Sequence, residues 1–212
     1  MCYQKATEID SKFESAWNQL AGIFYDDSNF VQAIECYGEV TKLNPKEKYA
    51  WVNKGLSCDY LGNHKQSIEC YDKATNLDPR YENAWFNKGL AYLNHENYKK
   101  AIACFDKVTT LNPKYGNAWN NKGLAYLNHE NYKKAIACFD KELKIDGKYE
   151  PAWYNKGLAQ GNLKNYKKSI ACFDKATEID AKDQDIWIEK GISYHNLKNY
   201  KQAIACYDKV TE

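Results

Sequence analysis

A stretch of twenty-one residues, NKGLAYLNHENYKKAIACFDK, occurs twice without change, at 87–107 and at 121–141. The two copies lie 34 residues apart, and the same period separates the six tryptophans of the chain, which are Trp17, Trp51, Trp85, Trp119, Trp153 and Trp187. A period of this length is typical of an array built from copies of one supersecondary unit. Each unit of such an array leaves an apolar face that the next unit covers. The repeat therefore predicts a solenoid.

Within one period, the apolar and small residues follow helical spacing in two blocks. Trp85, Gly89 and Tyr92 are separated by four and three residues, which places them on one face of a helix. After a turn, Ala101 and Phe105 are again four residues apart. Each unit is therefore predicted to be a pair of antiparallel helices, A and B. The small residues at 89 and 101 are expected where the two backbones approach closely.

Polar residues and prolines mark the ends of the predicted B helices. An asparagine precedes each one, where its side chain can cap free backbone N–H groups. These residues are Asn29, Asn63, Asn97, Asn131, Asn165 and Asn199. Pro45, Pro79 and Pro113 follow three of the B helices, and proline cannot continue a helix.

The order Trp-x-x-x-Gly-x-x-Tyr, Ala-x-x-x-Phe and Pro, at a period of 34, resembles the tetratricopeptide repeat. The resemblance covers residues 14–212 and implies an all-α fold, a right-handed superhelical α-solenoid of antiparallel helix pairs with about 13 helices. One departure is regular, because lysine replaces the usual leucine three residues after the tryptophan. We expect each lysine to lay its stem on the apolar stripe and to keep its charge in water. These residues are Lys54, Lys88, Lys122, Lys156 and Lys190.

Placing each tryptophan fourth in its repeat divides the chain into six repeats. They span 14–47, 48–81, 82–115, 116–149, 150–183 and 184–212, the last of them truncated. Residues 1–13 align with the second half of a preceding repeat and predict a lone B helix. The sequence thus begins and ends inside repeats, as a piece of a longer array would. Exposed solenoid ends predict weak head-to-tail self-association.

The cysteines follow the same period. Seven of the eight belong to one series with 34-residue spacing, namely Cys2, Cys36, Cys70, Cys104, Cys138, Cys172 and Cys206, and only Cys58 lies outside it. Stacked helical layers lie about 8–10 Å apart, which is too far for a disulfide between neighbours in the series. We expect buried free thiols in a reducing compartment, and therefore a cytoplasmic protein.

Charge and hydropathy argue against other partners. The 30 basic and 28 acidic residues give a net charge of +2 and alternate along the chain, so no nucleic-acid surface is indicated. No apolar run is long enough to span a membrane, and residues 1–10 do not resemble a secretory signal.

The resemblance implies a concave groove lined by the A helices, which binds peptides and partner proteins. Counting from the first residue of a repeat, places 2, 5, 6, 9, 12 and 13 face it. Asparagine recurs at place 6 (Asn53, Asn87, Asn121 and Asn155) and at place 13 (Asn94, Asn128, Asn162 and Asn196). Apolar groove residues are Leu56, Leu90, Leu124 and Leu158 at place 9, with Phe86 and Tyr154 at place 5.

An asparagine amide both donates and accepts, so the two rows could bind the backbone of an extended segment at about every third residue. We therefore expect a non-catalytic scaffold that binds a protein or peptide partner. The plainer interpretation remains open, because asparagine is common at place 6 in the family and suits a helix end at place 13.

Two other functions remain as alternatives. The first is a structural array that assembles head to tail. The second is a co-chaperone module that grips a terminal carboxylate and needs lysine at place 2. That place holds Ser15, Tyr49, Asn83, Asn117, Pro151 and Asp185, so half of the clamp is missing.

Enzymatic and metal-binding functions find little support. His64, His95, His129 and His195 occupy places 17, 14, 14 and 12, so they share no common layer and are expected as surface turn residues. No catalytic triad, phosphate-binding loop or HExxH motif occurs. The cysteines form no CxxC pair, so no metal or cofactor is expected.

Glu142 breaks the pattern at a place that is apolar in the other repeats. It is expected to face the next repeat, where a buried carboxylate is costly unless it is paired or reaches water. We therefore predict a loose seam between repeats four and five. The alternative is a glutamate that extends into solvent while Leu143 fills its place.

Overall fold

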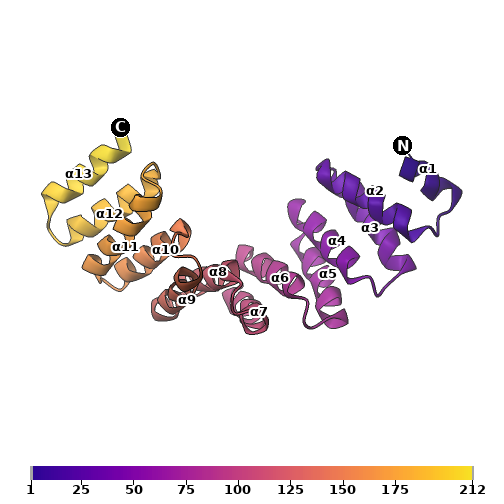
Figure 1. Cartoon of the computed structure of the whole chain (residues 1–212), viewed down its shortest axis with the longest axis horizontal. Helices are drawn as coiled ribbons and strands as arrows, with labels where there is room; N and C mark the ends of the chain where they lie inside the picture. Colours follow the sequence, from indigo (N-terminus) through magenta and orange to yellow (C-terminus); the bar gives the residue numbers. More distant parts are fainter. Residues whose placement is uncertain (1, 212) are drawn as a thin grey trace. The chain divides into compact units, whose positions relative to one another are not determined.

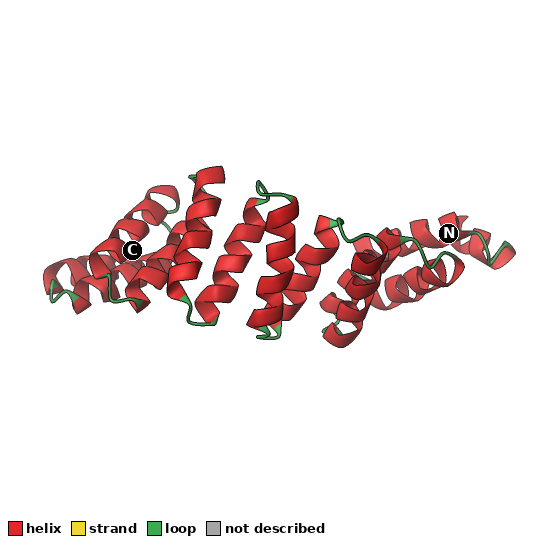
Figure 2. Cartoon of the chain, turned by 90° about the horizontal axis from the view of Figure 1, so that it is seen from below, coloured by secondary structure: helices red, strands yellow, loops and turns green. Residues whose placement is uncertain are grey.

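The computed structural model describes the backbone of residues 2–211, and the side chains of these residues except 2, 4, 7, 8 and 211. Within this range the chain forms thirteen helices and no strand (Figure 2). The helices are α1 (Cys2–Ile9), α2 (Glu14–Asp26), α3 (Phe30–Leu43), α4 (Lys48–Tyr60), α5 (His64–Leu77), α6 (Glu82–Asn94), α7 (Tyr98–Leu111), α8 (Gly116–Asn128), α9 (Tyr132–Ile145), α10 (Glu150–Asn162), α11 (Tyr166–Ile179), α12 (Gln184–Asn196) and α13 (Tyr200–Thr211).

The helices belong to two compact units, Met1–Leu111 and Asn112–Glu212. In the first unit α2 pairs with α3, α4 with α5 and α6 with α7 (Figure 1). In the second unit α8 pairs with α9, α10 with α11 and α12 with α13. Within each unit, the B helix of one pair packs against the A helix of the next, as α5 does on α6 and α11 on α12. The predicted all-α stack of antiparallel helix pairs is confirmed.

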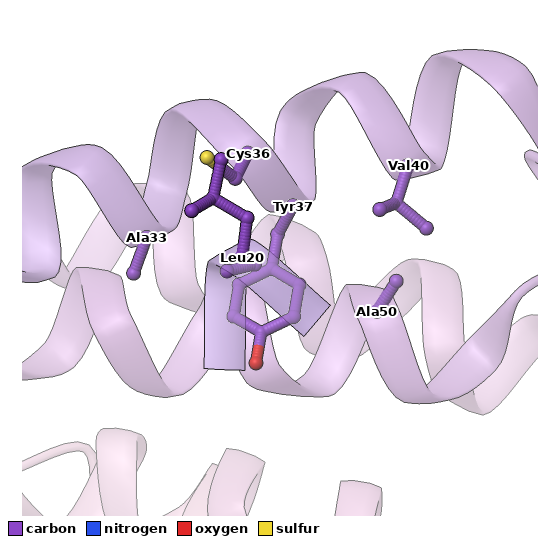
Figure 3. Close-up of a cluster of buried hydrophobic side chains, with 7 residues drawn as sticks. Leu20, Ala33, Cys36, Tyr37, Val40 and Ala50 are labelled. Carbon is purple, nitrogen blue, oxygen red and sulfur yellow. The ribbon is translucent and has the colours of Figure 1, made fainter. Parts of the chain in front are cut away.

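The core of each pair continues into the next. In the first repeat, Leu20 of α2 packs with Tyr37 and Val40 of α3, and Ala50 of α4 closes the same cluster (Figure 3). Val40 and Ala50 are fully buried, although they belong to different repeats. The apolar face of one helix pair is thus completed by the following pair, as the 34-residue period predicts.

The tryptophan makes the same hydrogen bond in every repeat. Its indole Nε1 donates to the carbonyl oxygen six residues earlier, in the loop before the A helix, at 2.9–3.0 Å. The acceptors are Ser11, Pro45, Pro79, Pro113, Gly147 and Ala181. A half-buried indole needs a partner for its N–H, and this bond ties each loop to its helix. The tryptophan period therefore marks equivalent niches.

The glycine at place 8 makes room for an aromatic ring. A Cβ on Gly55 would lie 2.7 Å from the ring of Tyr71, and one on Gly157 would lie 2.5 Å from the ring of Phe173. Gly89 packs against Phe105 in the same way, with a distance of 2.6 Å. We expected these small residues to admit a second backbone. The structure corrects this, because the nearest atoms belong to the ring of the same repeat.

The turn between the A and B helices contains one residue in the left-handed region. These residues have φ from 57° to 72° and are Ser28, Gly62, Glu96, Glu130, Lys164 and Lys198. Only the second repeat places glycine there, the residue that adopts this conformation without steric cost.

The predicted asparagine caps are present in four of the six repeats. The side-chain oxygens of Asn29, Asn97, Asn131 and Asn199 accept from the backbone N–H three residues later, at 3.4–3.5 Å. Asn63 and Asn165 make no such bond, so the prediction is wrong for them. The amide of Asn165 donates instead to Gln160 Oε1 at 3.0 Å.

In three repeats the lysine at place 7, namely Lys88, Lys156 and Lys190, pairs with an aspartate of the preceding B helix. Lys88 Nζ lies 2.5 Å from a carboxylate oxygen of Asp72, which belongs to the preceding B helix. Lys190 and Asp174 form the same pair at 2.7 Å. The two lysine side chains are only 13% and 12% exposed, and both Nζ atoms lie within 4.8 Å of the centre of their own tryptophan ring. Our expectation of a solvated charge is therefore wrong at these seams.

The described cysteines of the series are buried free thiols. The side chain of Cys2 lies outside the described residues. Cys58 of α4 faces Cys70 of α5 within one repeat, and the hydrogen bond between the two thiols lowers the pKa of Cys58. The same bond, together with burial, raises the pKa of Cys70.

Glu142 is buried, with only 3% of its surface exposed, and its Oε2 has no hydrogen-bond partner. Its carboxylate fills the space beside Gly116, at the start of the A helix of its own repeat. Burial, and next the charge of Asp146, raises its pKa. The glutamate therefore does not extend into solvent, which was the alternative expectation. The helices α9 and α10, which meet at the seam between repeats four and five, pack as extensively as α11 and α12 do at the next seam. The packing thus gives no sign of a loose seam, and its looseness stays a prediction.

Candidate functional site

In the described part of the chain, clefts open on the A helices of both units. The first has a volume of about 310 Å³, lies between α4, α5 and α6, and is lined by Leu56, Asp59, Tyr60, Tyr71, Asn87, Leu90, Ala91 and Asn94. The second has a volume of about 220 Å³ and lies between α10, α11 and α12. It is lined by Gly157, Leu158, Gly161, Asn162, Tyr166, Ser169, Phe173, Glu189, Ile192, Ser193 and Asn196.

The clefts bring together part of the predicted site. The first contains Leu56, Asn87, Leu90 and Asn94, and the second contains Leu158, Asn162 and Asn196. Places 6, 9, 12 and 13 contribute to both clefts. The other predicted residues line neither of them, and these are Asn53, Asn121, Asn155, Asn128, Leu124, Phe86 and Tyr154.

The asparagine rows are uneven in exposure and in bonding. Asn155 is only 7% exposed, which leaves little of its amide for a ligand. Asn121 donates to the carbonyl of Asn117 at 2.8 Å, and Asn162 and Asn196 donate likewise to the carbonyls four residues earlier. Each of these amides keeps its oxygen and its second N–H hydrogen for another partner.

The two aromatic residues of the predicted site rest on the ring at place 24 of their own repeat. Phe86 lies 5.8 Å from Phe105, and Tyr154 lies 6.0 Å from Phe173, measured between ring centres. Burial raises the pKa of Tyr154 to about 12, with further contributions from Glu189, Asp185 and other acidic residues. Both rings are half-buried.

Each cleft also contains an acidic residue that is not among the predicted groove residues. Asp59 accepts the hydroxyl of Tyr71 at its Oδ2, at 2.7 Å, and its Oδ1 lies 3.3 Å from His64 Nδ1. Glu189 is half-buried in the second cleft, and burial, followed by the charge of Asp185, raises its pKa. An available signal was the replacement of asparagine by glutamate at place 6 of the last repeat.

Two histidines meet, contrary to expectation. The rings of His64 and His95 lie 3.8 Å apart between centres and pack edge to face. They occupy different places, but the start of α5 and the end of α6 are adjacent in the stack. Among the described residues, no group of three or more His, Cys, Asp or Glu side chains is arranged to hold a metal ion.

None of the helices in the described part of the chain combines the length and apolar character needed to cross a membrane. No curated protein matches the chain in sequence.

Solved structures share the fold. A tetratricopeptide repeat protein from Parabacteroides merdae superposes with a TM-score of 0.82 at 20% identity, over 93% of this chain and 78% of that one. MamA from Desulfovibrio magneticus gives a TM-score of 0.74 at 22% identity, over 77% and 93% of the two chains. YrrB, described as a TPR protein with an unusual peptide-binding site, gives 0.71 at 21% identity, over 84% and 92%.

Sequence models of the repeat match most of the chain. The tetratricopeptide repeat matches residues 82–115, 116–149, 151–183 and 184–212, and the TPR repeat matches 60–96. These matches extend from residue 60 to residue 212. The recurring tryptophan niche, the glycine–ring contact and the paired helices are found in the same segments. The chain belongs to the tetratricopeptide repeat family.

Proposed function

We propose that this protein is a non-catalytic scaffold whose A-helix face binds extended segments of a partner protein. The observation that carries the proposal is the pair of clefts, which gather leucine and asparagine from the same places of the repeat. Protein interaction is the general role of the family, and the peptide-binding site described for YrrB supports a peptide ligand.

The chemistry of the clefts suits a peptide. Leu56 and Leu90 offer apolar walls, and Asn87 and Asn94 offer amides that donate to and accept from a peptide backbone. Repeats stacked at about 10 Å would meet a strand rising about 3.3 Å per residue at every third residue. Affinity would come from the backbone, and sequence preference from the side chains that enter the clefts.

A library of extended 12-residue peptides, screened for binding and measured by fluorescence anisotropy, tests this proposal. The double variant Asn87→Ala/Asn94→Ala, which removes both amides of the first cleft, should weaken binding about tenfold or more, because each lost amide removes hydrogen bonds. Asn76→Ala is the matched control, since Asn76 is exposed on the B helix α5. Unchanged binding by the double variant, with unchanged thermal unfolding, would refute the role of the asparagine rows.

A second candidate is self-association, which one exposed stripe on α13 favours. Tyr200, Ile204 and Tyr207 are 54%, 59% and 38% exposed and lie four and three residues apart. Light scattering of the chain and of Ile204→Lys tests it. A concentration-dependent mass that the substitution abolishes would support self-association, and a constant monomer mass would rule it out.

A further inference from the structure

We infer that the partner segment is basic, and that each cleft accepts the side chain of a lysine or an arginine. This inference rests on the proposed function and specifies its ligand. It is carried by the charges that line the two clefts and by the distribution of basic residues over the repeat.

In the first cleft, Asp59 is the only charged residue among those that line it. Each of its carboxylate oxygens has one neighbour, Tyr71 or His64, and a carboxylate oxygen can accept two hydrogen bonds. The apolar walls from Leu56 and Leu90 match the aliphatic stem of a long basic side chain. An ammonium or guanidinium group can therefore reach a carboxylate while its stem stays on leucine.

The rim of the first cleft adds an aromatic ring. Tyr60 is 65% exposed, and its ring stacks on Phe30 with 4.5 Å between ring centres and 5° between ring planes. Tyr25 packs edge to face against both rings. A ring fixed in this way can contact a cation without losing conformational freedom on binding.

In the second cleft, Glu189 is the only charged residue among those that line it. Leu158 and Ile192 lie on either side of the cleft as apolar walls. A carboxylate removed from water is stabilised most by a cation that it can pair with. Both clefts thus combine one carboxylate with apolar walls, and the carboxylate comes from place 12 in the first cleft and from place 6 in the second.

Lysine and arginine are absent from the places that line these clefts, although His195 occupies place 12 of the last repeat. Both clefts use places 6, 9, 12 and 13, and none of the 30 Lys and Arg residues occupies any of these places in the six repeats. Three residues at these places are acidic, namely Asp26, Asp59 and Glu189. The neighbouring lysines at place 7, such as Lys88 and Lys190, are held by aspartates of the preceding B helix. An acidic face on a chain with a net charge of +2 favours a basic ligand and disfavours a phosphate-bearing one.

Three pools of capped 12-residue peptides with otherwise randomised sequences test the inference. Every third residue is Lys or Arg in the first pool, Gln in the second and Glu in the third. We expect the basic pool to bind about tenfold or more tightly than the Gln pool, since hydrogen bonds between oppositely charged groups are stronger than those of a neutral amide. The Glu pool should bind weakest.

Asp59→Asn and Glu189→Gln should each reduce the preference for the basic pool, and the double variant should abolish it. Asparagine keeps an acceptor for the Tyr71 hydroxyl, and Glu189→Gln probes the other unit independently. Glu178→Gln is the control, because Glu178 lies on α11 with a side chain that is 62% exposed.

The outcomes separate the two proposals. Equal binding of all three pools, or a basic preference that survives the double substitution, would overturn the basic ligand but leave peptide binding intact. Absence of binding by every pool would overturn peptide binding and the basic ligand together.

Discussion

The two clefts occupy equivalent positions of the repeat, three periods of 34 residues apart, yet different places of the repeat supply their acidic residue. Leu56 in the first cleft corresponds to Leu158 in the second, and Asn94 corresponds to Asn196. The acidic group, however, changes place. Where the first cleft has Asp59 the second has a glycine, and where the second has Glu189 the first has an asparagine.

This difference shows that separate places of the repeat determine the packing of the helices and the charge of the cleft. The glycine at place 8 and the ring at place 24 are retained in both clefts, and they set the distance between the A and B helices. The residues at places 6 and 12 differ between the two clefts, and in the first cleft Asp59 at place 12 also accepts a hydrogen bond from the ring at place 24. The repeat therefore fixes the shape of a cleft, and single residues fix its charge.

The shared shape depends most on the glycine–ring contact. Gly157→Ala and Gly55→Ala should each lower the free energy of unfolding by about 1–3 kcal/mol, because the new methyl group would collide with Phe173 or Tyr71. Unfolding in urea, followed by circular dichroism, measures the loss. Gly22→Ala is the control, since nothing lies within 4 Å of its added Cβ, and alanine should stabilise that helix by about 1 kcal/mol. Equal effects at positions 22 and 157 would contradict the packing argument.

The ring at place 24 differs between the clefts by one hydroxyl. Tyr71→Phe removes the hydrogen bond to Asp59 and should lower the free energy of unfolding by about 1 kcal/mol. The reciprocal change, Phe173→Tyr, introduces a hydroxyl where Gly161 offers no side-chain acceptor, and should also destabilise, by about 1 kcal/mol or more. Adding Gly161→Asp to Phe173→Tyr should recover part of that loss. Failure of the pair to recover stability would show that Asp59 is not a matched partner of Tyr71.

The contribution of Glu189 to the free energy of unfolding should change with pH in the opposite direction to that of the Lys48–Asp78 salt bridge in the first unit. Burial raises the pKa of Glu189, so between its unfolded and folded pKa values the folded state holds the proton more tightly. Its contribution to stability therefore falls as the pH rises from about 4.5 through the folded pKa. The hydrogen bond from Lys48 lowers the pKa of Asp78 in the first unit, so that contribution is lost as the pH falls.

Thermal unfolding between about pH 4.5 and pH 7 measures this response. Glu189→Gln should lose less stability than the unchanged chain as the pH rises across this range. Glu178→Gln should follow the unchanged chain. A variant at 189 with the same pH profile as the unchanged chain would show that the carboxylate is not penalised by burial.

The sequence predicted the helices and their pairing because each repeat encodes them locally. Trp85 and Phe105, for example, mark the same niches in every copy. The sequence did not predict which acidic residues line a cleft, because a cleft is formed by three helices from two repeats. The expectation of a solvated lysine at place 7 was also wrong. A spacing of 16 residues that could have indicated the ion pair recurs at Asp72–Lys88, Asp140–Lys156 and Asp174–Lys190. His64 and His95 were missed for the same reason, since contact between repeats joins different places.

The Lys–Asp pair supports both clefts, but it is missing between the first two repeats. Lys54 lies 5.6 Å from the centre of the Trp51 ring, and the place of the aspartate is taken by Gly38, whose added Cβ would lie 3.6 Å from Lys54 Nζ. Gly38→Asp should therefore stabilise the chain by about 0.5–1 kcal/mol, through a better helix former and a new ion pair. Gly38→Asn separates the two effects, because it changes the helix propensity without adding charge. If urea unfolding shows the two variants to be equally stable, the ion pair contributes nothing at this seam, and the pairs behind the clefts would then serve geometry more than stability.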